Sequence, residues 1–170
     1  KEISVNHLFT SSFYQKIGEF KWKFMQTGVL AAAPSHAAAF LKSVRNKTSV
    51  DTQINMRPIS FIKNENGKIE VEPTAGLTCE IVVLKPESKG QVLIRSNDIS
   101  DAPKIILNIF EKAEDRKVAV LGVKHLRKAL RNTPIAQHII EEKSSISYKK
   151  DQKFIENYIR ERGITACHAV

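Results

Sequence analysis

The chain has 170 residues, 42% of them hydrophobic and 26% charged, which is the composition of a globular protein large enough for one core. No apolar run reaches the roughly 18 residues that a membrane-spanning helix needs. The first residues, "KEISVNHLFT", lack Met and the basic-then-apolar pattern of a signal peptide, so we expect a mature or excised N-terminus. The composition predicts a soluble chain and favours the cytoplasm without determining the compartment.

The formal net charge is +9, from 27 Lys and Arg against 18 Asp and Glu. Such an excess is typical of nucleic-acid-binding proteins. Here, however, the basic residues are spread over distant segments such as "KHLRKALR" and "SYKKDQKF", and no segment interleaves them with the aromatic residues on which bases stack. We therefore expect a solvated basic surface and no nucleic-acid partner, and we keep a basic nucleic-acid-binding domain as an alternative.

The first part of the chain predicts one helix and a loop. In "SSFYQKIGEFKWKFMQTG", from Ser11 to Gly28, apolar residues recur every three or four positions, which is the pattern of an amphipathic helix. The apolar stripe consists of Phe13, Ile17, Phe20 and Phe24. We expect this stripe to face the core rather than a cofactor. "VLAAAPSHAAAFLKS" then predicts a loop that leads into a short strand.

The middle of the chain predicts strands. "DTQINMRPIS" alternates apolar and polar residues, as a half-buried strand does. "NENGK", residues 64–68, is a turn signal between "ISFIK" and "KIEVE". The apolar runs "LTCEIVVLKP" and "QVLIRS" are separated by "ESKG" and predict an antiparallel hairpin. "APKIILNIF", residues 102–110, predicts a further strand.

The last third predicts two helices. "AEDRKVAVLGVKHLRKALRN" and "DQKFIENYIRERG" both show helical spacing, and Gly163 is a C-terminal stop signal. The expected buried faces are Val118, Leu121, His125, Leu126 and Ala129 in the first helix, and Phe154, Ile155, Tyr158 and Ile159 in the second. Strands followed by helices predict an α+β fold, in which a largely antiparallel sheet is flanked by helices within a single domain spanning residues 1–170.

The sequence lacks the common nucleotide-binding and hydrolase motifs. It has no Gly-x-Gly-x-x-Gly, no Gly-x-x-x-x-Gly-Lys-Ser/Thr and no Gly-x-Ser-x-Gly. The 5 histidines lack metal-ligand spacing, and Cys79 and Cys167 are too few for a zinc site or a disulfide framework. We therefore expect no cofactor-binding and no metal-binding residues. What remains is "TACH", where His168 follows a helix stop and is suited to proton transfer near neutral pH.

From residue 84 onward, the spacing of several residues fits a longer pattern. The chain follows Leu-x-Pro-x-Ser-x-Gly-x-Val, then Pro-x-Ile-x-x-Asn, then an acidic turn into a long helix. The matching residues are Leu84, Pro86, Ser88, Gly90, Val92, Pro103, Ile105, Asn108 and Asp115. Upstream, "FLKS" and the strand with Asp51 and Gln53 add to the pattern. This order resembles the C-terminal, substrate-binding region of the glucose–methanol–choline (GMC) flavoprotein oxidoreductases, and the choline-dehydrogenase-like branch more than the sugar oxidases.

The resemblance also covers the end of the chain. In the family, the last helix is followed by Thr-x-x-His-x-Val-Gly-Thr, whose His is the active-site base. Thr165, His168 and Val170 match this pattern. Cys167 stands where the family often has an aromatic residue. The resemblance therefore implies that His168 is catalytic and that Ala166 and Cys167 line the substrate pocket.

As a function, the resemblance implies an FAD-dependent alcohol oxidoreductase, which oxidises an alcohol to an aldehyde or ketone by hydride transfer to the flavin. The expected partners are a small-molecule alcohol and the flavin-binding domain of the same full-length chain, which binds the FAD. We expect residues 1–170 to be a fragment of that longer enzyme and to be inactive alone. A non-catalytic α+β ligand-binding module is the main alternative.

Overall fold

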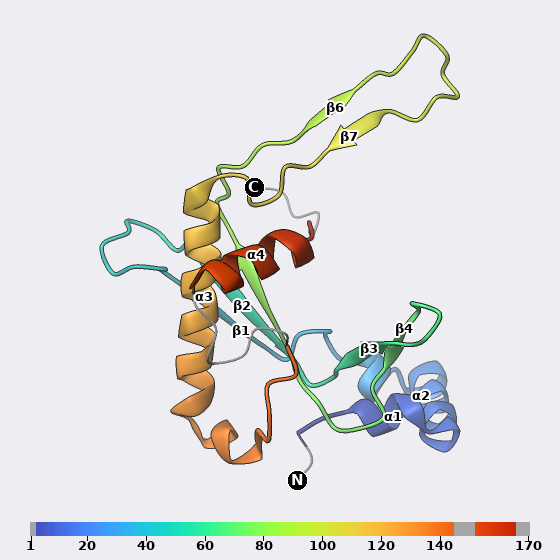
Figure 1. Ribbon diagram of the computed structural model, residues 1–170. Coiled ribbons are helices and arrows are strands. Elements are labelled where there is room, and N and C mark those ends of the chain that lie inside the picture. The colour runs from blue at the N-terminus through green and yellow to red at the C-terminus, as the bar shows by residue number, and fades with distance from the viewer. Residues whose placement is uncertain (1–2, 145–151, 166–170) are drawn as a thin grey trace. The chain divides into compact units, whose positions relative to one another are not determined.

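The computed structural model describes residues 3–144 and 152–165 (Figure 1). It confirms the predicted α+β fold, with helices and antiparallel strand pairs. The helices are α1 (Asn6–Thr10), α2 (Ser12–Met25), α3 (Ala113–Arg131) and α4 (Gln152–Arg162), with short 3-10 helices η1 (Val29–Ala31) and η2 (Pro134–His138). The strands are β1 (Ala37–Leu41), β2 (Thr52–Arg57), β3 (Phe61–Lys63), β4 (Ile69–Val71), β5 (Thr78–Val83), β6 (Gln91–Leu93) and β7 (Lys104–Ile106).

The described strands form three separate sheets. One has the order β1-β2-β5, and the other two pair β3 with β4 and β6 with β7. The β3–β4 hairpin confirms the turn predicted at residues 64–68, with Phe61 opposite Val71. The side-chain oxygen of Asn64 accepts a hydrogen bond from the backbone N–H of Lys68, so the first residue of the turn closes it.

The predicted hairpin between residues 77–86 and 91–96 is wrong. The strand β5 lies beside β2, whereas β6 pairs with β7 in antiparallel register, with Val92 opposite Ile105. The segment "ESKG" does not turn back because the backbone N–H groups of Glu87 and Ser88 bind a carboxylate of α3. The chain is therefore led past the start of α3 before β6 begins.

The chain groups into two compact units. The first comprises residues 1–39 and 54–80, and the second comprises residues 40–53 and 81–170. The prediction of one substrate-binding domain over the whole chain is not tested by this grouping and stays a prediction.

The first unit has a polar centre. The side chain of Asn6 is 1% exposed, and its amide group donates hydrogen bonds to Ser60 Oγ and to the carbonyl oxygens of Glu72 and Thr74. Its oxygen accepts hydrogen bonds from the Ser4 hydroxyl and from the Ser60 backbone N–H. A buried amide with all these partners links the N-terminal segment to the β3–β4 hairpin.

The helix α2 forms where expected, but its aromatic stripe is not buried. Phe13, Phe20 and Phe24 are 67%, 58% and 66% exposed. The rings of Phe20 and Phe24 contact each other, with centroids 4.8 Å apart. Within its unit α2 contacts α1 and η1, which are 5 and 3 residues long and too short to cover a four-turn helix. The prediction that the stripe faces the core is therefore wrong for these residues.

The second unit has an apolar core between α3, α4 and β5. Its buried members are Ala119, Val120, Val123, Ile155 and Ile159, with Ile81, Val83, Phe110 and Tyr158 packed around them. The predicted face of α4 is confirmed at Ile155 and Ile159, while Phe154 is 37% exposed. Packing against α3 therefore fixes the position of α4 within this unit.

On the predicted face of α3, Val118 is buried and Leu121 and Leu126 are half-buried, whereas His125 and Ala129 are exposed. The helix is apolar over a wide arc, so its periodicity allows two adjacent stripes. The structure buries the stripe that contains Ala119, Val120 and Val123 instead of the one that continues to His125. Gly122 on this side of the helix lets α3 approach β5 closely, because a Cβ atom there would lie 2.6 Å from Cγ2 of Ile81.

A second feature of this unit is the buried carboxylate of Asp51, at the start of β2. The backbone N–H and the hydroxyl of Ser43 donate hydrogen bonds to it over 2.7 and 2.6 Å, and the ammonium of Lys47 lies 3.0 Å away. The Asp51 carbonyl accepts a hydrogen bond from the Leu84 N–H, directly after β5. His125 Nε2 lies 3.0 Å from the Ser43 carbonyl oxygen, so α3 is joined to the same cluster.

Burial raises the pKa of Asp51, but the hydrogen bonds from Ser43 and the ammonium of Lys47 outweigh it and lower the pKa to about 2 from its usual 3.8. Because the folded-state pKa is the lower one, the resulting stability is complete above about pH 5 and is lost as the pH falls towards 2. A shift of this size corresponds to about 2 kcal/mol.

We expect Asp51→Asn to be less stable than the natural chain at pH 6, and we expect this difference to shrink by about 2 kcal/mol by pH 2. Urea unfolding at a series of pH values measures it. Glu65→Gln, in the exposed β3–β4 turn, controls for the loss of one negative charge. A difference that does not change with pH would show that the carboxylate of Asp51 contributes no ionic stabilisation.

Candidate functional site

The three predicted site residues, Ala166, Cys167 and His168, lie outside the described residues. The last described position is Thr165, three residues before the proposed base. Three elements hold the chain up to this point, namely α4, the turn before α3 and the start of α3.

The end of α4 is fixed by a close contact between Gly163 and the ring of Phe110. A Cβ atom at Gly163 would lie 2.6 Å from Cε2 of Phe110, closer than real side chains approach. The N–H of Gly163 donates a hydrogen bond to the carbonyl of Ile159 over 2.7 Å, which confirms Gly163 as the helix stop. Only glycine fits this position, so the contact sets the point from which the chain continues to Thr165.

Phe110 is itself held in an unusual conformation. Its φ is +58°, in the left-handed region that non-glycine residues rarely occupy. Arg116 of α3 donates a hydrogen bond from Nη1 to the Phe110 carbonyl over 2.8 Å. Asn108, two residues earlier, also has a positive φ of +49°, and its amide group donates to the carbonyl of Lys89. Asparagine tolerates this conformation, whereas for Phe110 it is strained and depends on its surroundings.

The start of α3 is held by Asp115, whose side chain is only 2% exposed. The backbone N–H groups of Glu87 and Ser88 each donate a hydrogen bond to its carboxylate over 2.8 Å, and the Ser88 hydroxyl donates another. Ser88 Oγ in turn accepts a hydrogen bond from the N–H of Lys112, the residue before α3. Burial raises the pKa of Asp115, but these hydrogen bonds lower it below the usual value overall.

Gly90 completes this arrangement. A Cβ atom there would lie 2.3 Å from the carbonyl oxygen of Ile106, so the start of β6 can lie beside the end of β7 only with glycine at this position. We call Ser88, Gly90, Asn108 and Asp115 the α3 junction. These four residues are also four of the pattern residues from residue 84 onward, and the structure gives each of them a role in backbone geometry rather than in chemistry.

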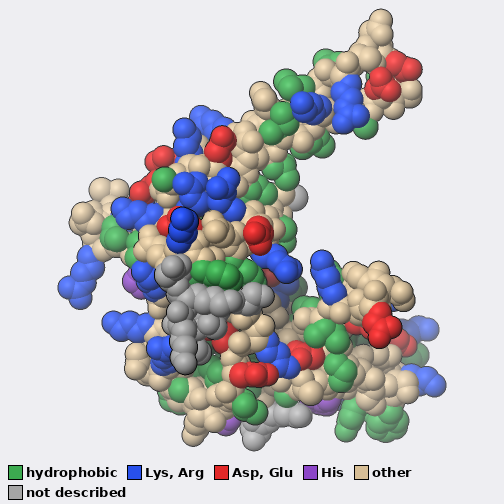
Figure 2. Space-filling model, viewed as in Figure 1, with side chains coloured by type: hydrophobic (Ala, Val, Ile, Leu, Met, Phe, Trp, Pro, Cys, Tyr) green, Lys and Arg blue, Asp and Glu red, His purple; other side chains and the backbone are tan. Residues whose placement is uncertain are grey.

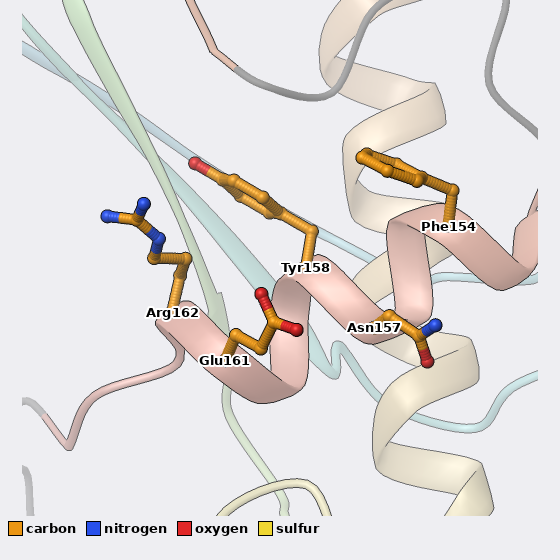
Figure 3. A pocket seen from close by; sticks show the side chains of 5 residues that line it. All are labelled: Phe154, Asn157, Tyr158, Glu161 and Arg162. Atoms are coloured by element: carbon orange, nitrogen blue, oxygen red, sulfur yellow. The ribbon is translucent and has the colours of Figure 1, made fainter.

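A hollow of about 210 Å³ lies on α4 and is lined by Phe154, Asn157, Tyr158, Glu161 and Arg162. Figure 3 shows that these five side chains all project from the same helix. Among the described residues, no second element contributes a lining side chain, so within residues 3–144 and 152–165 this hollow offers a ligand one side only.

The described residues offer few other candidates for a metal site or a catalytic nucleophile. Among residues 3–144 and 152–165, no three His, Cys, Asp or Glu side chains lie close enough to hold a metal ion. Burial raises the pKa of the Cys79 thiol, which disfavours the nucleophilic thiolate. Over the same part of the chain, no helix is long and apolar enough to cross a membrane.

Comparison with known proteins agrees with the pattern of the α3 junction. A model of the GMC oxidoreductase family matches residues 86–170, which is half of the chain. The chain therefore belongs to the GMC oxidoreductase family, as the sequence pattern predicts.

Choline dehydrogenases and an alcohol dehydrogenase are among the proteins that this chain is similar to. The chain is 24% identical over 153 residues to the oxygen-dependent choline dehydrogenases of Burkholderia cenocepacia (strain HI2424) and Proteus mirabilis (strain HI4320), covering 90% of this chain and 26% and 27% of theirs. It is 27% identical over 155 residues to the alcohol dehydrogenase [acceptor] of Pseudomonas putida, covering 91% of this chain and 27% of that enzyme. The chain thus spans about a quarter of the length of these relatives.

Two features of this region are not apparent from the sequence, namely the backbone conformation of Phe110 and the contact between Asp115 and Ser88. Phe110 appears in the sequence as the last residue of an expected strand, and nothing in its type indicates a left-handed conformation. Asp115 is recognisable as an acidic residue in the first turn of a helix, where the helix dipole favours it. Its contact with Ser88 joins positions 27 residues apart, and spacing alone does not predict that contact.

We expect Asp115→Ala to lower the free energy of unfolding by at least about 2 kcal/mol, because it leaves the N–H groups of Glu87 and Ser88 without their acceptor. Chemical denaturation measures this loss. Glu114→Ala is the matched control, since Glu114 lies in the same turn but forms only half-exposed ion pairs with Lys47 and Lys117, and should cost less than about 1 kcal/mol. Equal losses in the two variants would contradict the role given to Asp115.

Proposed function

We propose that this chain is the substrate-binding part of an FAD-dependent alcohol oxidoreductase. The observation that carries the proposal is the family match over residues 86–170, which includes the Thr165 and His168 positions. The names of the relatives, choline dehydrogenase and alcohol dehydrogenase, support an alcohol as substrate. Supporting geometry comes from Gly163 and Phe110, which hold the chain just before the proposed catalytic segment.

In this proposal, His168 accepts the hydroxyl proton of the bound alcohol. A neutral imidazole within hydrogen-bond distance of the hydroxyl stabilises the alkoxide character that develops as the C–H bond breaks. FAD, when bound, supplies the hydride acceptor. The sequence has no Gly-rich phosphate-binding motif, so a separate flavin-binding domain of the full-length protein would hold the FAD.

Ala166 and Cys167 are proposed to line the substrate pocket beside His168. Both side chains are small, and Cys167 stands where the family often has an aromatic residue. A small residue next to the base leaves more room around the carbinol carbon. The proposed pocket is therefore one that accepts bulkier alcohols than a pocket with an aromatic wall.

The first test is to read the coding DNA beyond both ends of this segment and to express the full-length protein. We expect it to bind FAD and to reduce it with a primary alcohol from a panel that includes choline. His168→Asn should slow flavin reduction by at least about 100-fold without changing the flavin content. Stopped-flow absorbance of the flavin measures the rate.

His138→Asn is the control for the loss of an imidazole, because His138 is exposed and lies in η2. It should reduce the flavin at the natural rate. If His168→Asn does so as well, His168 is not the base. If the full-length protein contains no flavin, the proposed oxidoreductase function is wrong.

A second test concerns the pocket wall. Cys167→Phe should lower kcat/KM for bulky alcohols by at least about tenfold while leaving the smallest substrates nearly unaffected. Cys167→Ser keeps the side-chain size and serves as control. Steady-state kinetics over an alcohol series measures the change, and an unchanged order of preference in Cys167→Phe would remove Cys167 from the pocket.

A further inference from the structure

The β6–β7 hairpin and its connection, residues 91–107, form a ribbon that we call the hairpin arm. One face of the arm is aliphatic. Val92 and Ile105 lie directly opposite each other and are 67% and 62% exposed. Ile94 and Leu107, the residues that directly follow β6 and β7, are 90% and 53% exposed. Figure 2 shows hydrophobic side chains at the surface along this ribbon.

The tip of the arm presents another isoleucine. Ile99 is fully exposed, with an exposed fraction of 104%. It sits in a turn closed by Asp98, which accepts hydrogen bonds from the backbone N–H and the hydroxyl of Ser100. The Ser96 hydroxyl donates across the turn to Asp101. Polar side chains thus order the turn around an apolar side chain that has no cover within its unit.

Packing within the arm does not hold the arm in position. No residue from 91 to 107 is buried, and a two-stranded ribbon alone is marginally stable in water. Its base, in contrast, is fixed by the α3 junction, through the buried carboxylate of Asp115 and the close backbone contact at Gly90. A ribbon held rigidly at its base and apolar along one face has the form of a docking element.

We propose that the aliphatic face of the hairpin arm docks on the flavin-binding domain of the full-length protein. This inference rests on the proposed function, because it takes that domain as the partner. The chain spans about a quarter of the length of its relatives, so a protein of their size supplies ample further surface to cover the arm.

Charge and area favour this occupant over others. Within the arm, Arg95 and Lys104 balance Asp98 and Asp101, so the arm has no net charge to attract a nucleic acid or an anionic lipid surface. Each partner of a stable independent complex buries about 800 Å². A domain tethered in the same polypeptide needs less, since its effective concentration is high.

The test uses trypsin on the full-length protein, because Arg95 and Lys104 place two cleavage sites within the arm. We expect cleavage at Arg95 to be slow in the natural protein. Val92→Asp and Ile105→Asp place a charge on the aliphatic face and should speed this cleavage by at least about tenfold. Leu93→Asp, the next residue of β6, lies on the opposite face and should leave cleavage slow.

Several outcomes would overturn the proposal. Rapid cleavage at Arg95 in the natural protein shows that the arm is uncovered, and this result does not depend on whether any variant folds. Protection that falls on dilution, together with a dimer in sedimentation velocity, assigns the face to a second copy. Protection that arises only with phosphatidylcholine vesicles assigns it to lipid. Absorbance of bound flavin in the same samples tests the proposed function separately.

Discussion

The second unit depends on one buried carboxylate, that of Asp115. Its oxygens accept hydrogen bonds from the backbone N–H groups of Glu87 and Ser88. Ser88 Oγ accepts a hydrogen bond from the N–H of Lys112, the residue before α3. An N–H group buried without an acceptor is costly, so this single side chain decides where the segment after β5 runs. As a result β6 begins only after the chain has passed the start of α3, and it pairs with β7. The same contacts set the start of α3, against which α4 packs.

Asp51 serves the second unit in the same way. Its side chain accepts from both the backbone and the hydroxyl of Ser43, and its backbone joins the ends of β1 and β5. In a chain with a large excess of positive charge, the charged groups that the described residues bury deeply are thus carboxylates that organise loops. Ser88 and Asp115, two of the pattern residues that match the family, thus have a structural role among the described residues. They hold the backbone from which the last helix and the residues after it continue.

The sequence predicts local structure well because helical periodicity and turn residues are local properties. The bounds of α2, α3 and α4 and the turn at residues 64–68 follow from them. Three expectations fail for one common reason, which is that they concern partners distant in the chain. The pairing of β6 depends on Asp115, the buried stripe of α3 depends on the close approach of β5, and the exposure of α2 depends on how little of its own unit can cover it. His168, Ala166 and Cys167 come from the resemblance alone, because a short segment after a helix stop has no periodicity to interpret.

Two parts of the structure expose apolar side chains, namely α2 and the hairpin arm. Among the described residues, Phe13, Phe20 and Phe24 of α2 and the isoleucines of the hairpin arm are largely exposed, each within its own unit. Contiguous exposed apolar surface of this kind marks a contact with another surface. A periodic apolar stripe predicts that a face is covered, but it does not predict by which residues. For a chain that spans about a quarter of its relatives, the covering residues need not lie within the same 170.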